Sequence, residues 1–169
     1  LITNILKLNR LENQQIFPER KQYNLTEQIC ECLLLFEQSW ASKNINIETE
    51  LEEDIFIHED AELLSLVWNN LFSNAIKFTD NGGTVGVKVK QEGLTAVVEV
   101  SDSGCGISPE TGKHIFEKFY QGDTSHAMQG NGLGLALVKR VIDIVGADIH
   151  VQSTLGEGST FIVYLRENI

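Results

Sequence analysis

The 169-residue sequence predicts an α+β fold, a two-layer α/β sandwich in which helices cover one face of a mixed, mostly antiparallel sheet. Three observations predict it. Residues 61–79 carry apolar side chains at helical spacing, whereas residues 85–100 alternate between apolar and polar side chains, as a β-hairpin does. A second helical pattern over 135–146 is followed by a second pair of alternating strands over 149–165.

The N-terminal part of the chain is predicted to be mainly helical. Apolar residues at coiled-coil spacing indicate a helix over 1–12, and Phe17-Pro18 ends this pattern. A helix this short is marginal in water, so it either packs on a partner or continues a preceding helix, or alternatively it lies on its own domain. A second amphipathic helix is predicted over 26–43, and short strands are predicted over 45–51 and 55–57.

Composition excludes several classes of partner. The net charge of −11 argues against nucleic acid or an anionic membrane surface, so no nucleic-acid partner is expected. The three cysteines show no metal-ligand spacing and are expected to be reduced thiols. No stretch approaches the length of a membrane span. An acidic chain that binds a polyanion such as a nucleotide needs local devices, such as a metal ion or a helix N-terminus.

Asp102 is the first candidate binding residue. A strand ends at this acid, and Gly104 and Gly106 follow at alternate positions. Glycine permits positive φ angles and places no side chain beside the backbone, so a flat ligand can approach closely. A carboxylate beside such a slot is suited to accept a hydrogen bond from an exocyclic amine.

The helix over 61–79, which Asp60 is placed to cap, carries a row of polar groups. Asn70, Asn74 and Lys77 follow one another at helical spacing. Each asparagine alone is explained by hydrogen bonds to neighbouring backbone, but two of them followed by a lysine favour a site. Amide oxygens are suitable ligands for Mg²⁺ bound to phosphates, and Lys77 supplies a positive charge.

A second glycine cluster, Gly130 to Gly134, opens the helix over 135–146. Free backbone N–H groups and a helix N-terminus together form an anion site, although a flexible loop that needs glycine turns explains the cluster equally well. The spacing is that of neither a P-loop nor a dinucleotide fingerprint. The preceding polar run, 121–129, is predicted to be mobile. Together these features suit a purine at Asp102 and phosphates near the glycine cluster.

Four motifs, in order, resemble those of sensor histidine kinases. Residues 70–79 resemble the N box, 102–106 the G1 box, 116–119 the F box and 130–135 the G2 box. The resemblance covers roughly residues 22–169. It implies the Bergerat-type ATP-binding sandwich of the GHKL superfamily and the catalytic ATP-binding domain of a two-component kinase.

The resemblance also implies residue roles. Asn74 would coordinate Mg²⁺, Asn70 and Lys77 would contact the phosphates, and Asp102 would accept from the amino group of adenine. Phe78 would lie against the adenine, and Thr160 would line the same pocket. The complete set implied to bind ATP is Asn70, Asn74, Lys77, Phe78, Asp102, Gly104, Gly106, Ile107, Phe119, Gly130, Gly132, Leu133, Gly134 and Thr160.

The resemblance further implies partners and a domain division. Residues 1–18 resemble the C-terminal end of a dimerisation and phosphoacceptor hairpin, and residues 19–169 the catalytic domain. The γ-phosphoryl group would pass to a histidine of that hairpin, in a homodimer of the parent protein, and then to a response-regulator aspartate. The domain would be cytoplasmic and its parent anchored in the cell membrane.

The sequence departs from the family in two places. His58 lacks the following Arg/Lys-Thr-Pro of a phosphoacceptor box, so this chain is not expected to phosphorylate itself on histidine. Gln121 and His126 stand where many relatives carry lid arginines, which puts charge neutralisation during phosphoryl transfer in question.

Three alternative functions remain. One is a serine kinase acting on an anti-sigma antagonist. Another is a nucleotide-dependent switch resembling chaperone, mismatch-repair and topoisomerase ATPases, whose catalytic carboxylate is replaced here by Asn70. The third is a degenerate interaction domain, against which the intact Asn74, Asp102 and glycine positions speak.

Overall fold

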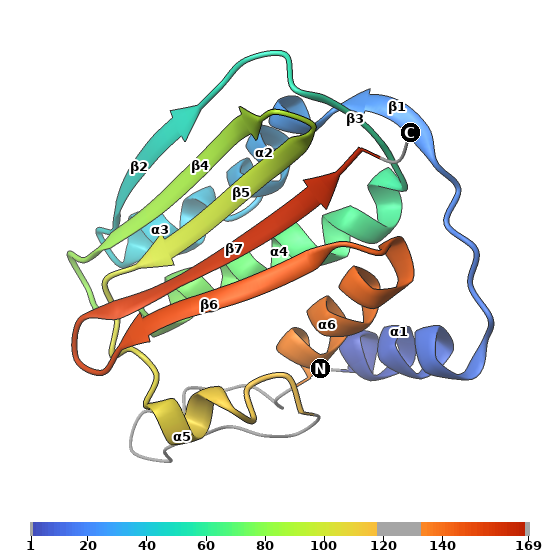
Figure 1. Ribbon diagram of the computed structural model, residues 1–169. Coiled ribbons are helices and arrows are strands. Elements are labelled where there is room, and N and C mark those ends of the chain that lie inside the picture. The colour runs from blue at the N-terminus through green and yellow to red at the C-terminus, as the bar shows by residue number, and fades with distance from the viewer. Residues whose placement is uncertain (1, 118–132, 168–169) are drawn as a thin grey trace.

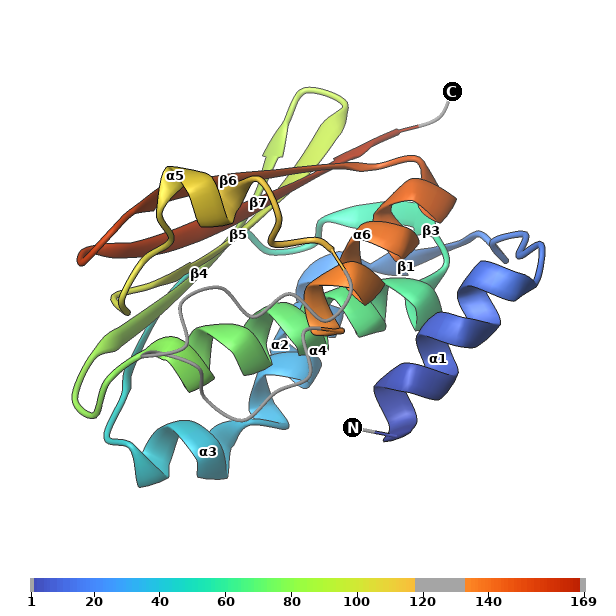
Figure 2. The same ribbon diagram turned by 90° about the horizontal axis from the view of Figure 1, so that it is seen from below.

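The computed structural model describes residues 2–117 and 133–167 and has two layers, a five-stranded sheet and a set of helices on one of its faces (Figures 1 and 2). The sheet has the strand order β2-β4-β5-β7-β6, and β1 and β3 form a separate two-stranded sheet. In chain order the elements are α1 (Ile2–Asn13), β1 (Lys21–Asn24), α2 (Leu25–Leu34), α3 (Glu37–Ser42), β2 (Asn46–Leu51), β3 (Phe56–Glu59), α4 (Ala61–Phe78), β4 (Thr84–Glu92), β5 (Thr95–Asp102), α5 (Pro109–Gly112), α6 (Gly134–Val145), β6 (Asp148–Thr154) and β7 (Gly158–Arg166).

The predicted fold class is confirmed. β2 pairs with β4 in parallel, whereas the β4–β5, β5–β7 and β6–β7 pairs are antiparallel. The sheet is therefore mixed and mostly antiparallel, and Figure 2 shows α4 and α6 running beneath it. None of the helices in the described part of the chain combines the length and the apolar character that a bilayer crossing needs.

The core lies between α4, α6 and the inner face of the sheet. Alternate residues of β4, β5 and β7 point inward, which is why their sequences alternate. On α4 and α6 the large, fully buried side chains are Trp68, Phe72, Leu64, Leu71, Leu137 and Ile142, and Val85, Val87, Val98 and Val163 face them from the strands.

Both ends of α4 are fixed by side chains. Asp60 is the predicted N-cap, and its Oδ1 accepts from the backbone N–H of Leu63 at 3.0 Å. At the other end, Lys43 Nζ donates to the carbonyl oxygen of Ile76 at 2.8 Å. A cation at a helix C-terminus is favourable because it meets the negative end of the helix dipole. Fixing this end of α4 matters because the candidate site lies beside it.

The predicted helix over 26–43 is divided. α2 ends at Leu34, and the backbone N–H of Phe36 bonds to Leu33 three residues back, which tightens the last turn before α3. The division leaves Leu34 and Leu35 exposed and turns Phe36 toward the core. β1 was not expected, since its four residues carry no apolar alternation.

The N-terminal helix α1 packs on α6. Leu8 and Leu11 are buried against this part of the core, and Arg140 Nη2 donates to the carbonyl oxygen of Leu11 at 3.1 Å. Of the two alternatives for this helix, the structure shows packing on its own domain. The assignment of residues 1–18 to a separate hairpin stays a prediction.

Candidate functional site

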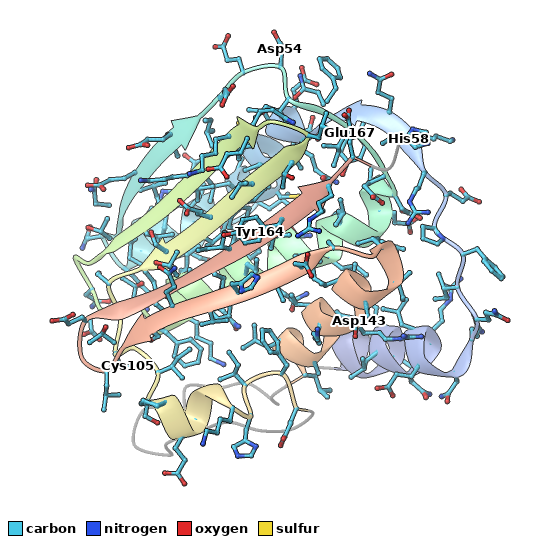
Figure 3. The ribbon with its side chains drawn as sticks, viewed as in Figure 1. Asp54, His58, Cys105, Asp143, Tyr164 and Glu167 are labelled. Carbon is cyan, nitrogen blue, oxygen red and sulfur yellow. The ribbon has the colours of Figure 1, made fainter. Side chains whose placement is uncertain are left out.

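A cavity of about 540 Å³ opens at the end of the molecule where α4, β5 and the β6–β7 hairpin meet. Figure 3 places Cys105 at this end, between the hairpin and α5. The lining residues come from four places: the end of α4 and the turn after it, the segment from the end of β5 through α5 to Ile115, the β6–β7 hairpin with the start of β7, and the start of α6. They are Asn74, Phe78, Asp80, Asp102, Ser103, Gly104, Cys105, Gly106, Ile107, Ser108, Thr111, Ile115, Leu135, Leu155, Gly156, Ser159 and Phe161.

Asp102 is the carboxylate that β5 delivers to this cavity. Its Oδ1 accepts from the backbone N–H of Gly104 at 2.9 Å. Burial raises the pKa of the Asp102 carboxyl above its ordinary value, and the backbone N–H groups of Gly104 and Ser159 partly offset that rise. Two backbone N–H partners still leave lone pairs of the carboxylate available to a ligand in the cavity.

Two glycines allow the loop after Asp102 to pack closely against the end of α4 and against β6. A Cβ atom on Gly104 would overlap the main-chain carbonyl oxygen of Phe78, so the loop lies directly on the end of α4. Gly106 has a φ of 71°, and a Cβ atom there would overlap the carbonyl oxygen of Thr154. Side chains at either position would therefore displace the wall of the cavity.

The last two turns of α4 contribute an amide and an aromatic ring. Asn74 and Phe78 both line the cavity. Lys77 does not line it, but its Nζ lies over the Phe78 ring, 5.3 Å from the centroid. Burial lowers the pKa of the Lys77 ammonium group. The lysine therefore holds a partly desolvated positive charge beside the aromatic wall.

Asn70 and Gly134 face each other where α4 meets α6. The side-chain amide of Asn70 donates to the carbonyl oxygen of Leu66 at 2.6 Å. A hydrogen bond to neighbouring backbone was the alternative to a binding role that the sequence left open for each asparagine. Its Oδ1 would lie 3.0 Å from a Cβ atom on Gly134. Asn70 is thus outside the lining of the cavity and against the first turn of α6.

Five described residues of the predicted set do not line the cavity: Asn70, Lys77, Leu133, Gly134 and Thr160. Thr160 does not line the cavity, because β7 alternates: Ser159 and Phe161 face the helices and the cavity, whereas Thr160 points to the other face. Leu133 is 1% exposed and belongs to the core, and Leu135 lines the cavity. The two-residue alternation of β7, applied from Phe161, would have identified Ser159.

Five positions named from the sequence lie outside the described residues: Phe119, Gln121, His126, Gly130 and Gly132. Other lining residues were missed, notably Cys105, Ser108 and Thr111. Cys105 stands inside the 102–106 motif itself, whereas Ser108 and Thr111 carry no signal in the sequence beyond their nearness to it.

The arrangement suits a flat heteroaromatic ring that carries an amino group. Phe78, Ile107, Ile115 and Phe161 supply apolar walls, and Asp102 supplies an acceptor. Asn74 adds a side-chain amide to the lining, and an amide oxygen is a suitable ligand for Mg²⁺. The described residues contain no cluster of three or more His, Cys, Asp or Glu that could hold a metal. A single amide oxygen fits Mg²⁺ that takes its other ligands from phosphate oxygens and water.

Relatives of this chain are kinases. It is 36% identical over 173 residues to the circadian input-output histidine kinase CikA of Synechococcus elongatus, which covers 99% of this chain and 23% of CikA. It is 30% identical over 167 residues to the sensor-like histidine kinase SenX3 of Mycobacterium tuberculosis, covering 98% of this chain and 41% of SenX3. The chain thus spans well under half the length of these relatives.

Solved structures of histidine kinases also resemble this chain. Full-length ShkA, crystallised in complex with AMPPNP, superposes with a TM-score of 0.85 at 26% identity, covering 96% of this chain and 34% of ShkA. Residues 59–169 match the family described as histidine kinase-, DNA gyrase B-, and HSP90-like ATPase. This chain therefore belongs to that ATPase family, as a catalytic ATPase domain of the sensor histidine kinase type.

Proposed function

We propose that this chain binds Mg-ATP in the cavity and, as part of a longer sensor kinase, donates the γ-phosphoryl group to a histidine of a dimerisation domain. A response-regulator aspartate then receives the group. The single observation that carries the proposal is the half-buried Asp102 carboxylate at the wall of a 540 Å³ cavity, in a chain of this ATPase family. ShkA supports it, because that relative was solved with AMPPNP, an adenine nucleotide.

The base occupies the end of the cavity near Asp102. The carboxylate accepts a hydrogen bond from the exocyclic amino group of adenine, and the ring lies between Phe78 and Ile107. A charge-assisted hydrogen bond in a water-poor cavity is stronger than one between neutral groups. Gly104 and Gly106 let this loop pack directly on the end of α4 and on β6, which fixes the position of the wall beside the ring.

The phosphates extend toward α6. Asn74 would hold Mg²⁺, which when bound neutralises the charge on the phosphate oxygens. Lys77 supplies a positive charge from the same helix, and the first turn of α6, with Asn70 against it, supplies backbone N–H groups. The glycines at 130 and 132 complete the phosphate side in this proposal.

The chain positions the phosphoryl group, and the acceptor comes from elsewhere in the parent protein. A ring nitrogen of the acceptor histidine attacks the γ-phosphorus, the bond to the bridging oxygen breaks, and ADP leaves. His58 does not serve as acceptor, because it stands exposed on β3 and is not among the residues that line the cavity. Figure 3 shows it at the opposite end of the sheet from Cys105.

The partners follow from this role. ThkA, whose complex with the response regulator TrrA has been solved, superposes with a TM-score of 0.83 at 25% identity, covering 99% of this chain and 47% of ThkA. We infer a response regulator as the partner of the parent protein here, together with its own dimerisation domain in a homodimer. We also place the domain in the cytoplasm, with a parent anchored in the cell membrane.

The test uses γ-labelled Mg-ATP. A parent protein that contains the dimerisation hairpin is incubated with label beside this chain alone and beside the parent with Asn74→Ala. Acid-labile, base-stable label on the parent and not on the other two is the expected result, since this pattern is typical of phosphohistidine. Binding of ATP without label on the parent would contradict the kinase role and favour a nucleotide-dependent switch.

A further inference from the structure

The loop that carries Ile107 is held against the β6–β7 hairpin by one side chain. Ser153, on β6, accepts a hydrogen bond from the backbone N–H of Ile107 at 2.7 Å. The backbone N–H of Gly156 adds a bond to the carbonyl oxygen of Cys105 at 2.6 Å. Ile107 and Cys105 line the cavity, but Ser153 does not. Ser153 therefore acts on the cavity wall from outside it.

The same hydroxyl reaches a second cavity residue. Ser153 Oγ donates to the carbonyl oxygen of Gly158 at 3.0 Å and lies 2.9 Å from Ser159 Oγ. A serine hydroxyl has one proton and two lone pairs. The Ser153 hydroxyl donates its proton to the carbonyl oxygen of Gly158, and one of its lone pairs accepts from the N–H of Ile107. Its second lone pair therefore accepts the hydrogen bond from the Ser159 hydroxyl. The proton of the Ser159 hydroxyl thus points at Ser153, away from the cavity.

Ser159 then offers the cavity lone pairs only. It stands directly opposite Asp102 in the β5–β7 register, and both line the cavity. Two acceptors side by side suit an amino group, which has two N–H donors. A keto oxygen at the same place is itself an acceptor and finds no donor there. The keto oxygen, Asp102 and Ser159 would then all lack hydrogen-bond partners, which is unfavourable.

We propose that Ser153 is a positioning residue for recognition of the base: it holds Ile107 in the cavity wall and fixes Ser159 as an acceptor, so that a 6-aminopurine is selected over a 6-ketopurine. This inference rests on the proposed nucleotide site. It extends that site to a residue that touches no ligand, through a chain of three hydrogen bonds.

The test compares ATP and GTP affinities by calorimetry, in Mg²⁺, for the full chain and three variants. Ser153→Ala frees the Ser159 proton to rotate toward the cavity. We expect ATP binding to weaken about fivefold, as for the loss of one hydrogen bond, and the ATP-to-GTP affinity ratio to fall by about threefold or more. Ser153→Thr keeps the hydroxyl and restores both values.

Ser65→Ala is the matched control. Ser65 also donates to a main-chain carbonyl oxygen, that of Glu62 at 2.6 Å, but near the opposite end of α4 from Phe78. This variant is expected to match the wild type in both affinities. A general loss of stability in Ser153→Ala would weaken ATP and GTP binding together and leave the ratio unchanged, and that result would overturn the proposal.

A second readout needs no variant. The backbone N–H of Ile107 in the nucleotide-free wild type is expected to exchange with deuterium slowly, because Ser153 holds it. Exchange at the rate of an unprotected amide would overturn the proposal. Failure of the wild type to bind ATP would overturn the proposed function as well. Wild-type ATP binding with an unchanged preference in Ser153→Ala would overturn only the role of Ser153.

Discussion

Gly104 lies directly on the main-chain carbonyl oxygen of Phe78, so the loop after β5 and the last turn of α4 share a contact that only glycine permits. The two segments are 26 positions apart in the sequence, yet together they form one wall of the cavity. Any side chain at position 104 has to move one segment away from the other.

We therefore predict that Gly104→Ala lowers the free energy of unfolding by about 2 kcal/mol, as overpacking does, and weakens ATP binding at least about tenfold. Urea unfolding and calorimetry measure the two effects. Gly112→Ala is the control, because a Cβ atom there meets only Ile107 Cγ2, at an ordinary 3.9 Å. Its free energy of unfolding should stay within about 0.5 kcal/mol of wild type. Equal behaviour of the two variants would refute the contact.

Asp102 should stabilise the ligand and destabilise the empty protein. Its pKa is raised by burial above the ordinary 3.8, so the native state holds its proton more tightly than the unfolded chain. The stability that this proton gives is present at low pH and is lost as the pH rises through the raised pKa. At pH 7 the nucleotide-free Asp102→Asn variant should therefore be more stable than wild type, by about 1 kcal/mol.

The pH dependence of unfolding checks this. The difference between Asp102→Asn and wild type should shrink as the pH falls toward about 4, the ordinary carboxyl range. Asp143→Asn, which removes an exposed carboxylate paired with Lys139 at 3.1 Å, should shift stability by no more than about 0.5 kcal/mol. An Asp102→Asn variant less stable than wild type at pH 7 would show that the carboxylate is structural.

Arg20 joins the segment after α1 to strand β3 and to the end of α6. Its Nε donates to Glu59 Oε2 at 3.2 Å, and its Nη2 donates to the carbonyl oxygen of Val145 at the end of α6, at 3.1 Å. The Glu59 side chain is only 7% exposed, and burial raises the pKa of its carboxyl despite Arg20. Without Arg20, this carboxylate has lost the cation that compensates its burial.

Arg20→Met should lower the free energy of unfolding by about 2 kcal/mol at pH 7, somewhat less than for a fully buried pair, because Arg20 is partly exposed. The loss should decrease as the pH falls, since protonation of Glu59 removes the unpaired charge. Arg166→Met is the control: its pair with Asp148, at 3.7 Å, is exposed on both sides, and its removal should change stability by about 0.5 kcal/mol or less. Equal losses in the two variants would contradict this role for Arg20.

Asn74 should matter only when Mg²⁺ is present. For Asn74→Ala we expect the increase in ATP affinity that Mg²⁺ produces to fall about tenfold, with affinity in EDTA within about twofold of wild type. Titrations in Mg²⁺ and in EDTA measure both. Ser73→Ala, at the neighbouring exposed position of α4, should behave as wild type. A weaker affinity of Asn74→Ala in EDTA as well would assign Asn74 to the nucleotide itself.

Much of the fold could be predicted from local patterns. The Asp60 cap, the Gly146 end of α6 with its φ of 75° and the alternating strands all follow from short-range chemistry, and the structure confirms them. The break after Leu34 could not be predicted, because apolar spacing continues through Phe36 and Trp40. β1 is also set by tertiary structure: its four residues become a strand only because β3 pairs with them.

In the candidate site, too, some residues could be predicted from local sequence and others depend on tertiary structure. Asp102, Gly104, Asn74 and Phe78 were placed at one site from the sequence, and all four line the cavity. The family resemblance suggested that Thr160 lines the pocket. Because side chains alternate along β7, Ser159 lines the cavity instead. The backbone bond of Asn70 depends on which rotamer its packing against α6 selects, which helical spacing does not encode. The role of Ser153 requires the register of β6 and β7, a purely tertiary property.

The most direct test of the central claim is calorimetric titration of wild type and Asp102→Asn with Mg-ATP. Wild type should bind with one site per chain, and Asp102→Asn should bind at least about tenfold more weakly, as expected for loss of a charge-assisted hydrogen bond in a buried site. Equal affinity of the two proteins, or no binding by the wild type at millimolar ATP, would contradict a nucleotide site built around Asp102.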